Sequence, residues 1–220
     1  MADEVTLLDF WPSPFGMRVR LALTLKGIDY IYKEENLQQK SDLLLKSNPI
    51  HKKIPTMIHN GNPISESLIM VQYIDETWPK TSSLLPSDPY GRSQSRFWAD
   101  YVDKKVYDCG RRTCFAKSPE EGDAAVKELL ECLKVVECEL GEKLYFGGEN
   151  LGYVDVALVP FYSWFYAYES FGGLSIRDEC PKIVAWAKRC LENESVAKSL
   201  PDQQKVYEFV VMMRKKFGVE

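Results

Sequence analysis

The chain has 220 residues, of which 45% are hydrophobic and 27% charged, so it can bury a substantial core in one large domain or two small ones. A net charge of −4 and only short basic clusters argue against a nucleic-acid partner. The chain contains no apolar run of about 18 residues or more, and its acidic start is unlike a signal peptide. We therefore expect a cytoplasmic protein with no membrane partner.

The first predicted elements are a strand at residues 5–10 and a helix that begins near Pro14 and ends near Gly27, since apolar residues recur there at helical spacing. Ser13 precedes the proline, and a serine at this position can cap a helix by accepting an N–H. A helix N-terminus that follows a strand also favours anions such as a thiolate or a phosphate. The local sequence leaves both interpretations of Ser13 open.

The next elements complete a small α/β domain. Residues 30–34 predict a strand, residues 40–46 a short helix, and residues 54–59 and 63–65 a hairpin around an Asn-Gly pair. A further helix follows from Ser67. The first 80 residues therefore predict the order βαβαββα, a sheet covered by helices.

The rest of the chain has a different pattern. Residues 81–89 are rich in Ser, Pro and Asp and predict a linker, after which residues 90–220 predict an all-helical domain. Helical periodicity is clearest over residues 90–116, 121–140, 181–191 and 205–217. Residues 155–168 are apolar almost all round, which indicates a helix buried in a bundle, and Pro160 should bend or interrupt it.

Six cysteines occur between residues 109 and 190 without a CxxC pair, and only two histidines could join them. This spacing is not that of a zinc site, and disulfides are rare in the cytosol. We expect mostly buried thiols and no bound metal.

Two further features of the first domain could face a ligand, as Ser13 could. Ile54 precedes Pro55 at the start of a strand, where proline fits only at an edge or after a cis bond, and a cis bond would turn the Ile54 backbone outward. Glu66 and Ser67 begin a helix, where a hydroxyl, an N–H group and the helix dipole could hold a carboxylate.

Seven short sequence motifs follow one another along the chain. They are WPSPFGMRVR at 11–20, SNPIHKKIP at 47–55, IHNG at 58–61, SESL at 65–68, LPSDPY at 85–90, FGGE at 146–149 and GYVD at 152–155. Each is weak alone, but their order and spacing over essentially the whole chain are highly specific. The sequence resembles the glutathione transferases, in particular the plant tau class.

The resemblance implies an α/β plus all-α fold, with a thioredoxin-like domain at residues 1–80 that binds glutathione and a helical domain at residues 90–220 that lines a hydrophobic cosubstrate site. Members of this family are homodimers. Glutathione is a cosubstrate, and no cofactor is expected. The family tends to carry Ser or Thr as the cap of the buried helix; Gly152 stands here instead, with Asp155 in place, a departure that affects folding and not catalysis.

The resemblance also implies roles for single residues. Ser13 resembles the catalytic serine that hydrogen-bonds the glutathione sulfur, and Lys40 and Lys53 would meet the glycyl carboxylate. Ile54 would pair with the cysteinyl backbone, and Glu66 with Ser67 would bind the γ-glutamyl end. The residues implied for the hydrophobic cosubstrate are Phe15, Tyr107, Arg111, Trp164, Tyr168 and Phe209. Each aromatic among them has an alternative role as a core residue.

The expected chemistry follows from thiol ionisation. A thiol of pKa about 8.5 is mostly protonated at neutral pH, and a helix N-terminus with a hydroxyl donor can lower that pKa. Ser13 would be the donor and not a nucleophile, since its neighbourhood contains no His and Asp that together suggest a hydrolase triad. The first cysteine is Cys109, which argues against thiol-exchange chemistry.

Three functions follow. The first is conjugation of glutathione to hydrophobic electrophiles in detoxification, with peroxidase activity as a possible addition. The alternative is a ligandin-type carrier of hydrophobic metabolites with little turnover, and the last is an interaction module. Retention of Ser13, Glu66 and Ser67 favours the enzyme, because carriage does not require an activated thiol.

Overall fold

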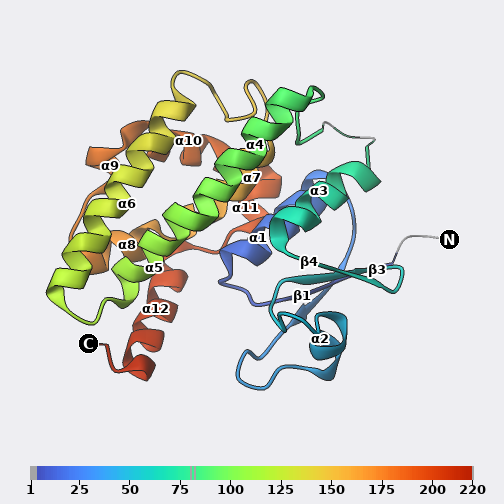
Figure 1. Cartoon of the computed structure of the whole chain (residues 1–220), viewed down its shortest axis with the longest axis horizontal. Helices are drawn as coiled ribbons and strands as arrows, with labels where there is room; N and C mark the ends of the chain where they lie inside the picture. The colour runs from blue at the N-terminus through green and yellow to red at the C-terminus, as the bar shows by residue number, and fades with distance from the viewer. Residues whose placement is uncertain (1–3, 80, 82, 220) are drawn as a thin grey trace. The chain divides into compact units, whose positions relative to one another are not determined.

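The computed structural model describes residues 4–79, 81 and 83–219 (Figure 1). Residues 80 and 82, at the end of the predicted first domain and in the predicted linker, lie outside the described residues, as do residues 1–3 and 220. The chain divides into two compact units, Met1–Leu85 and Pro86–Glu220.

The first unit is a four-stranded sheet with three helices. Its elements are β1 (Val5–Asp9), α1 (Pro14–Leu25), β2 (Ile31–Glu34), α2 (Asp42–Ser47), β3 (Thr56–His59), β4 (Asn62–Ser65) and α3 (Ser67–Thr77). The strand order is β2-β1-β3-β4, with β1 parallel to β2 and the other two pairs antiparallel. Helices α1 and α3 lie side by side on one face of the sheet, and α2 lies on the other (Figure 1). The predicted βαβαββα order and thioredoxin-like fold are confirmed.

The centre of this sheet is β1, and all five of its residues are buried. A strand covered on both faces is a continuous apolar run and does not alternate, which explains why Leu7 and Leu8 are both fully buried. The hairpin of β3 and β4 turns at Asn60 and Gly61, which have φ of 49° and 81°. Positive φ at both central residues suits the twist of a tight hairpin, as the Asn-Gly pair predicted.

The second unit is helical, as predicted. Its elements are α4 (Pro89–Tyr101), a π-helical turn η1 (Val102–Val106), α5 (Tyr107–Phe115), α6 (Pro119–Leu140), α7 (Tyr153–Leu158), a 3-10 segment η2 (Val159–Trp164), α8 (Phe165–Gly172), α9 (Ile176–Glu179), α10 (Pro181–Leu191), α11 (Glu194–Ser199) and α12 (Gln203–Phe217). In Figure 1, α6 runs beside the long rod made by α4, η1 and α5.

Three helices differ in detail from the sequence prediction. The helix expected at residues 90–116 is interrupted by the π-helical turn η1. The buried helix expected at residues 155–168 changes to 3-10 geometry at Val159, because Pro160 lacks an N–H and cannot continue the α-helical ladder. The helix expected at residues 40–46 begins only at Asp42, because Ser41 caps it through its Oγ, which accepts from the Leu44 N–H at 3.0 Å.

Asp155 is a buried residue that joins several segments of the second unit. Its carboxylate is fully buried and accepts from the backbone N–H groups of Phe146, Gly147 and Gly152 at 2.9, 2.9 and 2.8 Å. It also accepts from the indole Nε1 of Trp186 on α10 at 2.7 Å. One carboxylate therefore links the loop before α7, the start of α7 and α10. The glycine at the cap supplies no side chain, so Asp155 alone supplies the side-chain bond at this helix start.

A buried ion pair joins α1 to the end of the first unit. Lys26 Nζ lies 2.7 Å from Asp75 Oδ1, and both side chains are almost fully buried. The same carboxylate accepts from the N–H groups of Leu84 and Leu85 at 2.9 and 3.1 Å and from Ser83 Oγ at 3.0 Å. The segment that follows α3 is thus tied to the helix it leaves.

Five cysteines are buried and Cys138 is exposed, in agreement with the prediction of mostly buried thiols. Within the described part of the chain, no helix combines the length and apolar character needed to cross a membrane. In the same residues, no three or more His, Cys, Asp or Glu side chains are grouped so as to hold a metal ion.

Candidate functional site

The strand register brings the segments that carry Ser13, Ile54 and Glu66 to the same end of the sheet. Leu8, near the end of β1, pairs with Thr56 at the start of β3, and Thr56 pairs with Ser65 at the end of β4. The chain leaves β1 toward Ser13, enters β3 from Ile54 and leaves β4 toward Glu66. Three segments far apart in sequence therefore meet at this end of the sheet.

Ser13 is the N-cap of α1 and only 8% exposed. Its Oγ accepts from the Gly16 N–H at 3.3 Å, and its own N–H donates to the Phe10 carbonyl at 2.8 Å. Pro14 takes the first helical position. The serine is therefore an ordinary helix cap, and because its Oγ acts there as an acceptor, its hydroxyl hydrogen can still be donated to an anion. The two interpretations of Ser13 are compatible.

The loop between α2 and β3 carries the predicted residues Lys53 and Ile54, and Lys40 lies just before α2. The Lys40 ammonium donates to the Lys52 carbonyl at 2.7 Å, which ties it to this loop. Lys53 is exposed, and its carbonyl accepts from Asn48 Nδ2 at 3.0 Å. Of the two arrangements that the sequence left open for Pro55, the structure has the cis bond after Ile54, and β3 lies between β1 and β4 and not at an edge.

At the start of α3, Glu66 is exposed and has φ 71° and ψ 115°, a left-handed backbone that is unusual for a residue other than glycine. Its carboxylate lies 4.0 Å from His51 Nε2. Ser67 is 6% exposed, and its Oγ accepts from Arg18 Nη1 at 3.2 Å. Arg18 is fully buried on α1, and its guanidinium lies 5.2 Å from the centre of the Phe15 ring. Arg18 was not among the residues predicted for the site, because its partner Ser67 lies 49 positions away in the sequence.

Asp9 was also missed. It ends β1, its side chain is fully buried, and Arg20 Nε lies 3.4 Å from its Oδ2. The carboxylate lies against the first turn of α1, so that a Cβ on Gly16 would come within 1.7 Å of its Oδ1. Burial raises the pKa of Asp9 from its ordinary 3.8 to about 7, although the Arg20 guanidinium opposes this shift.

The raised pKa predicts how stability depends on pH. Between about pH 4 and 7 the unfolded chain ionises Asp9 while the folded chain keeps it protonated, so the folded state loses stability as pH rises. Asp9→Asn removes this loss. We expect the difference in unfolding free energy between the variant and the wild type to move by about 2–3 kcal/mol in favour of the variant from pH 5 to pH 8, measured by denaturant titration. Parallel pH curves for the two proteins would contradict this expectation.

The residues predicted for the hydrophobic cosubstrate lie in both units. Phe15 belongs to the first unit. In the second, the Trp164 ring centre lies 6.4 Å from that of Tyr168 and 6.4 Å from that of Phe209, so these three predicted residues form one aromatic cluster. Tyr107 and Arg111 follow one another on a single face of α5, one turn apart, and Arg111 is exposed.

Tyr168 is the most deeply buried residue of this aromatic cluster. It is 2% exposed, and a Cβ on Gly110 of α5 would come within 2.5 Å of its ring. The absence of a side chain at Gly110 therefore makes room for the tyrosine. Such packing fits the core role that each aromatic could have, and the contact of Tyr168 with a ligand stays a prediction.

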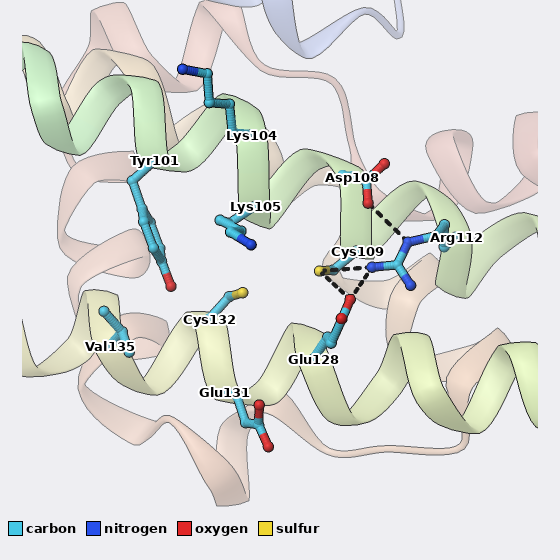
Figure 2. Close-up of a pocket in the computed structure, with 10 residues that line it drawn as sticks. All are labelled: Tyr101, Lys104, Lys105, Asp108, Cys109, Arg112, Glu128, Glu131, Cys132 and Val135. Carbon is cyan, nitrogen blue, oxygen red and sulfur yellow. Dashed lines mark hydrogen bonds and ion pairs between the residues drawn. The ribbon is translucent and has the colours of Figure 1, made fainter.

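A separate cavity of about 430 Å³ lies between the rod of α4, η1 and α5 and helix α6 (Figure 2). Its lining residues are Tyr101, Lys104, Lys105, Asp108, Cys109, Arg112, Glu128, Glu131, Cys132 and Val135. Arg112 is ion-paired with Glu128 and with Asp108, and burial raises the pKa of the Cys109 thiol to about 12. No residue predicted for the cosubstrate is among these lining residues, and their charges do not suit an apolar molecule.

Comparison with known proteins identifies the family. The models described as glutathione S-transferase, N-terminal domain, and glutathione S-transferase, C-terminal domain, match residues 3–76 and 93–194. A probable glutathione S-transferase parC of Nicotiana tabacum is 64% identical over 219 residues, which are 99% of each chain. The chain belongs to the glutathione S-transferase family.

Other relatives narrow the class of this glutathione S-transferase. Glutathione S-transferase U25 of Arabidopsis thaliana is 60% identical over 100% of this chain and 99% of its own. Rice GST1 (OsGSTU1), solved in complex with glutathione, has a TM-score of 0.94 and 50% identity with full coverage of both chains. A tau-class enzyme from mango, Mangifera indica, has a TM-score of 0.89 and 44% identity, with 95% and 98% of the two chains covered. The resemblance to the tau class is confirmed, and this glutathione S-transferase is an enzyme that conjugates glutathione.

Proposed function

We propose that Ser13 activates glutathione by donating its hydroxyl hydrogen to the sulfur, so that the thiolate attacks the electrophile. The observation that supports this proposal is the geometry of the helix cap. Ser13 Oγ accepts from the Gly16 N–H, which fixes the oxygen at the N-terminus of α1. The N–H groups of that first turn and the helix dipole add to the stabilisation of a thiolate. Each unit by which the thiol pKa falls corresponds to about 1.4 kcal/mol.

The rest of the glutathione tripeptide would lie along the same end of the sheet. Glu66 and Ser67 would bind the γ-glutamyl end, the Ile54 backbone would pair with the cysteinyl residue, and Lys40 with Lys53 would meet the glycyl carboxylate. Arg18, which donates to Ser67 Oγ at 3.2 Å, holds that hydroxyl in place. No cofactor is required, because the nucleophile is supplied by glutathione itself.

The cosubstrate that we propose is a hydrophobic electrophile bound by Phe15, Tyr107, Arg111, Trp164, Tyr168 and Phe209, and organic hydroperoxides are a second substrate class. The aromatic cluster around Trp164 supports an apolar ligand. We further propose that the enzyme acts in the cytoplasm as a homodimer.

Ser13→Ala is expected to raise the pKa of bound glutathione by one unit or more, because the thiolate loses its hydroxyl donor. The measurement is thiolate absorbance in the near ultraviolet as pH is varied, with glutathione saturating. The rate of conjugation at neutral pH should fall at least about tenfold, while the glutathione Kd changes little.

Ser118→Ala is the matched control. Ser118 also precedes a proline and caps a helix, α6, with its Oγ accepting from the Glu121 N–H at 3.3 Å. This variant should leave the thiol pKa unchanged. If wild-type protein binds glutathione with the pKa of free glutathione, or Ser13→Ala does not change the pKa, thiol activation by Ser13 is wrong.

A further inference from the structure

The peptide groups of Trp11 are held from two sides. Arg20 Nη2 on α1 donates to the Trp11 carbonyl at 2.8 Å. The Trp11 N–H donates to Glu34 Oε1 on β2 at 3.2 Å. Trp11 lies two residues before Ser13, and the Ser13 N–H closes the turn onto the Phe10 carbonyl. Arg20 and Glu34 thus act as a clamp on the start of the turn that carries the serine.

Arg20, one of the two residues of this clamp, also lies against Asp9. Arg20 Nε lies 3.4 Å from Asp9 Oδ2, and the side chains of the two residues are 14% and 0% exposed. Within the described part of the chain, Arg20 Nε and both Asp9 oxygens have no hydrogen-bond partner of good geometry. A buried carboxyl and guanidinium that face each other without a well-formed hydrogen bond require an explanation, since apolar residues of similar size often stabilise a fold as well.

Other groups restrict where the guanidinium can lie. Its carbon is 5.9 Å from the centre of the Tyr32 ring, and the Tyr32 hydroxyl is bonded to Glu34 Oε2. Arg20 therefore lies close to the carboxyl of Asp9 and to the Tyr32 ring, and it has the Trp11 carbonyl as its acceptor. A lysine could keep the positive charge at this position, but a single ammonium lacks the fork that reaches Asp9 and Trp11 together.

We propose that Arg20 is a positioning residue for thiol activation. Asp9 holds Arg20 in place, and Arg20 and Glu34 together fix the Trp11 backbone from its two sides. The position of Trp11 in turn fixes the direction of the Ser13 hydroxyl. This inference rests on the proposed role of Ser13. Arg20 touches no reacting atom in this arrangement. Its contribution is the geometry of the donor, on which the strength of a hydrogen bond to a thiolate depends.

Arg20→Lys tests the inference because the variant keeps the charge and changes the geometry. We expect the pKa of bound glutathione to rise by about half to one unit and kcat to fall about three- to tenfold, with glutathione KM changed less than about twofold. Arg189→Lys is the matched control, since Arg189 also donates to a backbone carbonyl, that of Leu144 at 2.7 Å, but from α10 in the second unit. It should leave the pKa unchanged.

The double variant Ser13→Ala/Arg20→Lys separates this inference from the proposed function. If Arg20 acts through Ser13, Arg20→Lys has no further effect on the thiol pKa once the hydroxyl is gone. The inference is overturned, and the role of Ser13 stays intact, if Arg20→Lys raises the thiol pKa equally in the wild-type and Ser13→Ala backgrounds. The same holds if Arg20→Lys does not raise the pKa in the wild-type background although Ser13→Ala does. If Ser13→Ala itself has no effect, both proposals fail.

Glu34→Ala gives a second measurement if Arg20→Lys does not fold. Glu34 is exposed on β2, so its loss leaves the core intact. Removing a negative charge near the thiolate would by electrostatics alone lower the thiol pKa. Loosening the clamp raises it instead, and the sign of the change decides between a positioning role and a simple charge effect.

Discussion

Asp155→Ala is expected to destabilise the helical unit by about 4 kcal/mol or more. Three backbone N–H groups and the Trp186 indole donate to this carboxylate, and all of them lose their acceptor in a site that water does not reach. Each donor left unpaired costs about 1–3 kcal/mol, and the four effects overlap because they share one acceptor. Denaturant unfolding followed by tryptophan fluorescence reports the change directly, since Trp186 packs at this junction.

Asp88→Ala is the control for Asp155→Ala. Asp88 is the N-cap of α4, is exposed and accepts from the Gly91 N–H at 2.7 Å. Its loss should lower the free energy of unfolding by about 1 kcal/mol. Similar losses for the two variants would mean that Asp155 acts as an ordinary cap and does not join α7 to α10.

Asp75→Ala is expected to destabilise the first unit by about 3–5 kcal/mol, the usual effect of removing one partner from a buried ion pair. The Lys26 ammonium stays buried without its counter-charge, and the N–H groups of Leu84 and Leu85 lose their acceptor. Thermal unfolding at neutral pH measures the loss. Asp100→Ala is the matched control, because it removes the aspartate from an exposed Lys–Asp pair at 2.8 Å and should have a much smaller effect.

The contribution of Asp75 should also depend on pH. Burial alone would raise the pKa of this carboxyl, but the hydrogen bonds from Lys26, Leu84 and Leu85 outweigh it and lower the pKa. Because the unfolded chain protonates at a higher pH than the folded chain, the contribution is complete above the ordinary aspartate pKa near 3.8 and is lost as pH falls below it. The gap between wild type and Asp75→Ala should therefore close in acid. A gap that stays constant down to pH 3 would contradict this origin.

Local signals were sufficient for the main features of the candidate site. A serine before a proline, placed between an apolar strand and an amphipathic helix, predicted the N-cap at Ser13. An Asn-Gly pair predicted the hairpin, and a proline at a strand start restricted the position to an edge strand or a cis bond, of which the structure has the cis bond after Ile54. These features depend on a few neighbouring residues, so their physics is contained in short stretches of sequence.

The missed features depend on contacts that no short stretch contains. Arg18 becomes a site residue only because α3 brings Ser67 to it across 49 positions. Asp9 and Arg20 meet because α1 packs back over the end of β1, and a charged residue at a strand end or on a helix gives no sign of burial. The π-helical turn at Val102–Val106 contains neither proline nor glycine, so no helix-breaking residue marked it in the sequence.

The backbone of Glu66 has a consequence for protein engineering. A residue other than glycine at φ 71° is held there at a cost of order 1–3 kcal/mol. Procedures that choose amino acids by conformational preference would place glycine at this position and improve heat resistance. They would also delete the carboxylate proposed for the γ-glutamyl group. Selection for thermal tolerance and selection for detoxification therefore favour different residues at position 66.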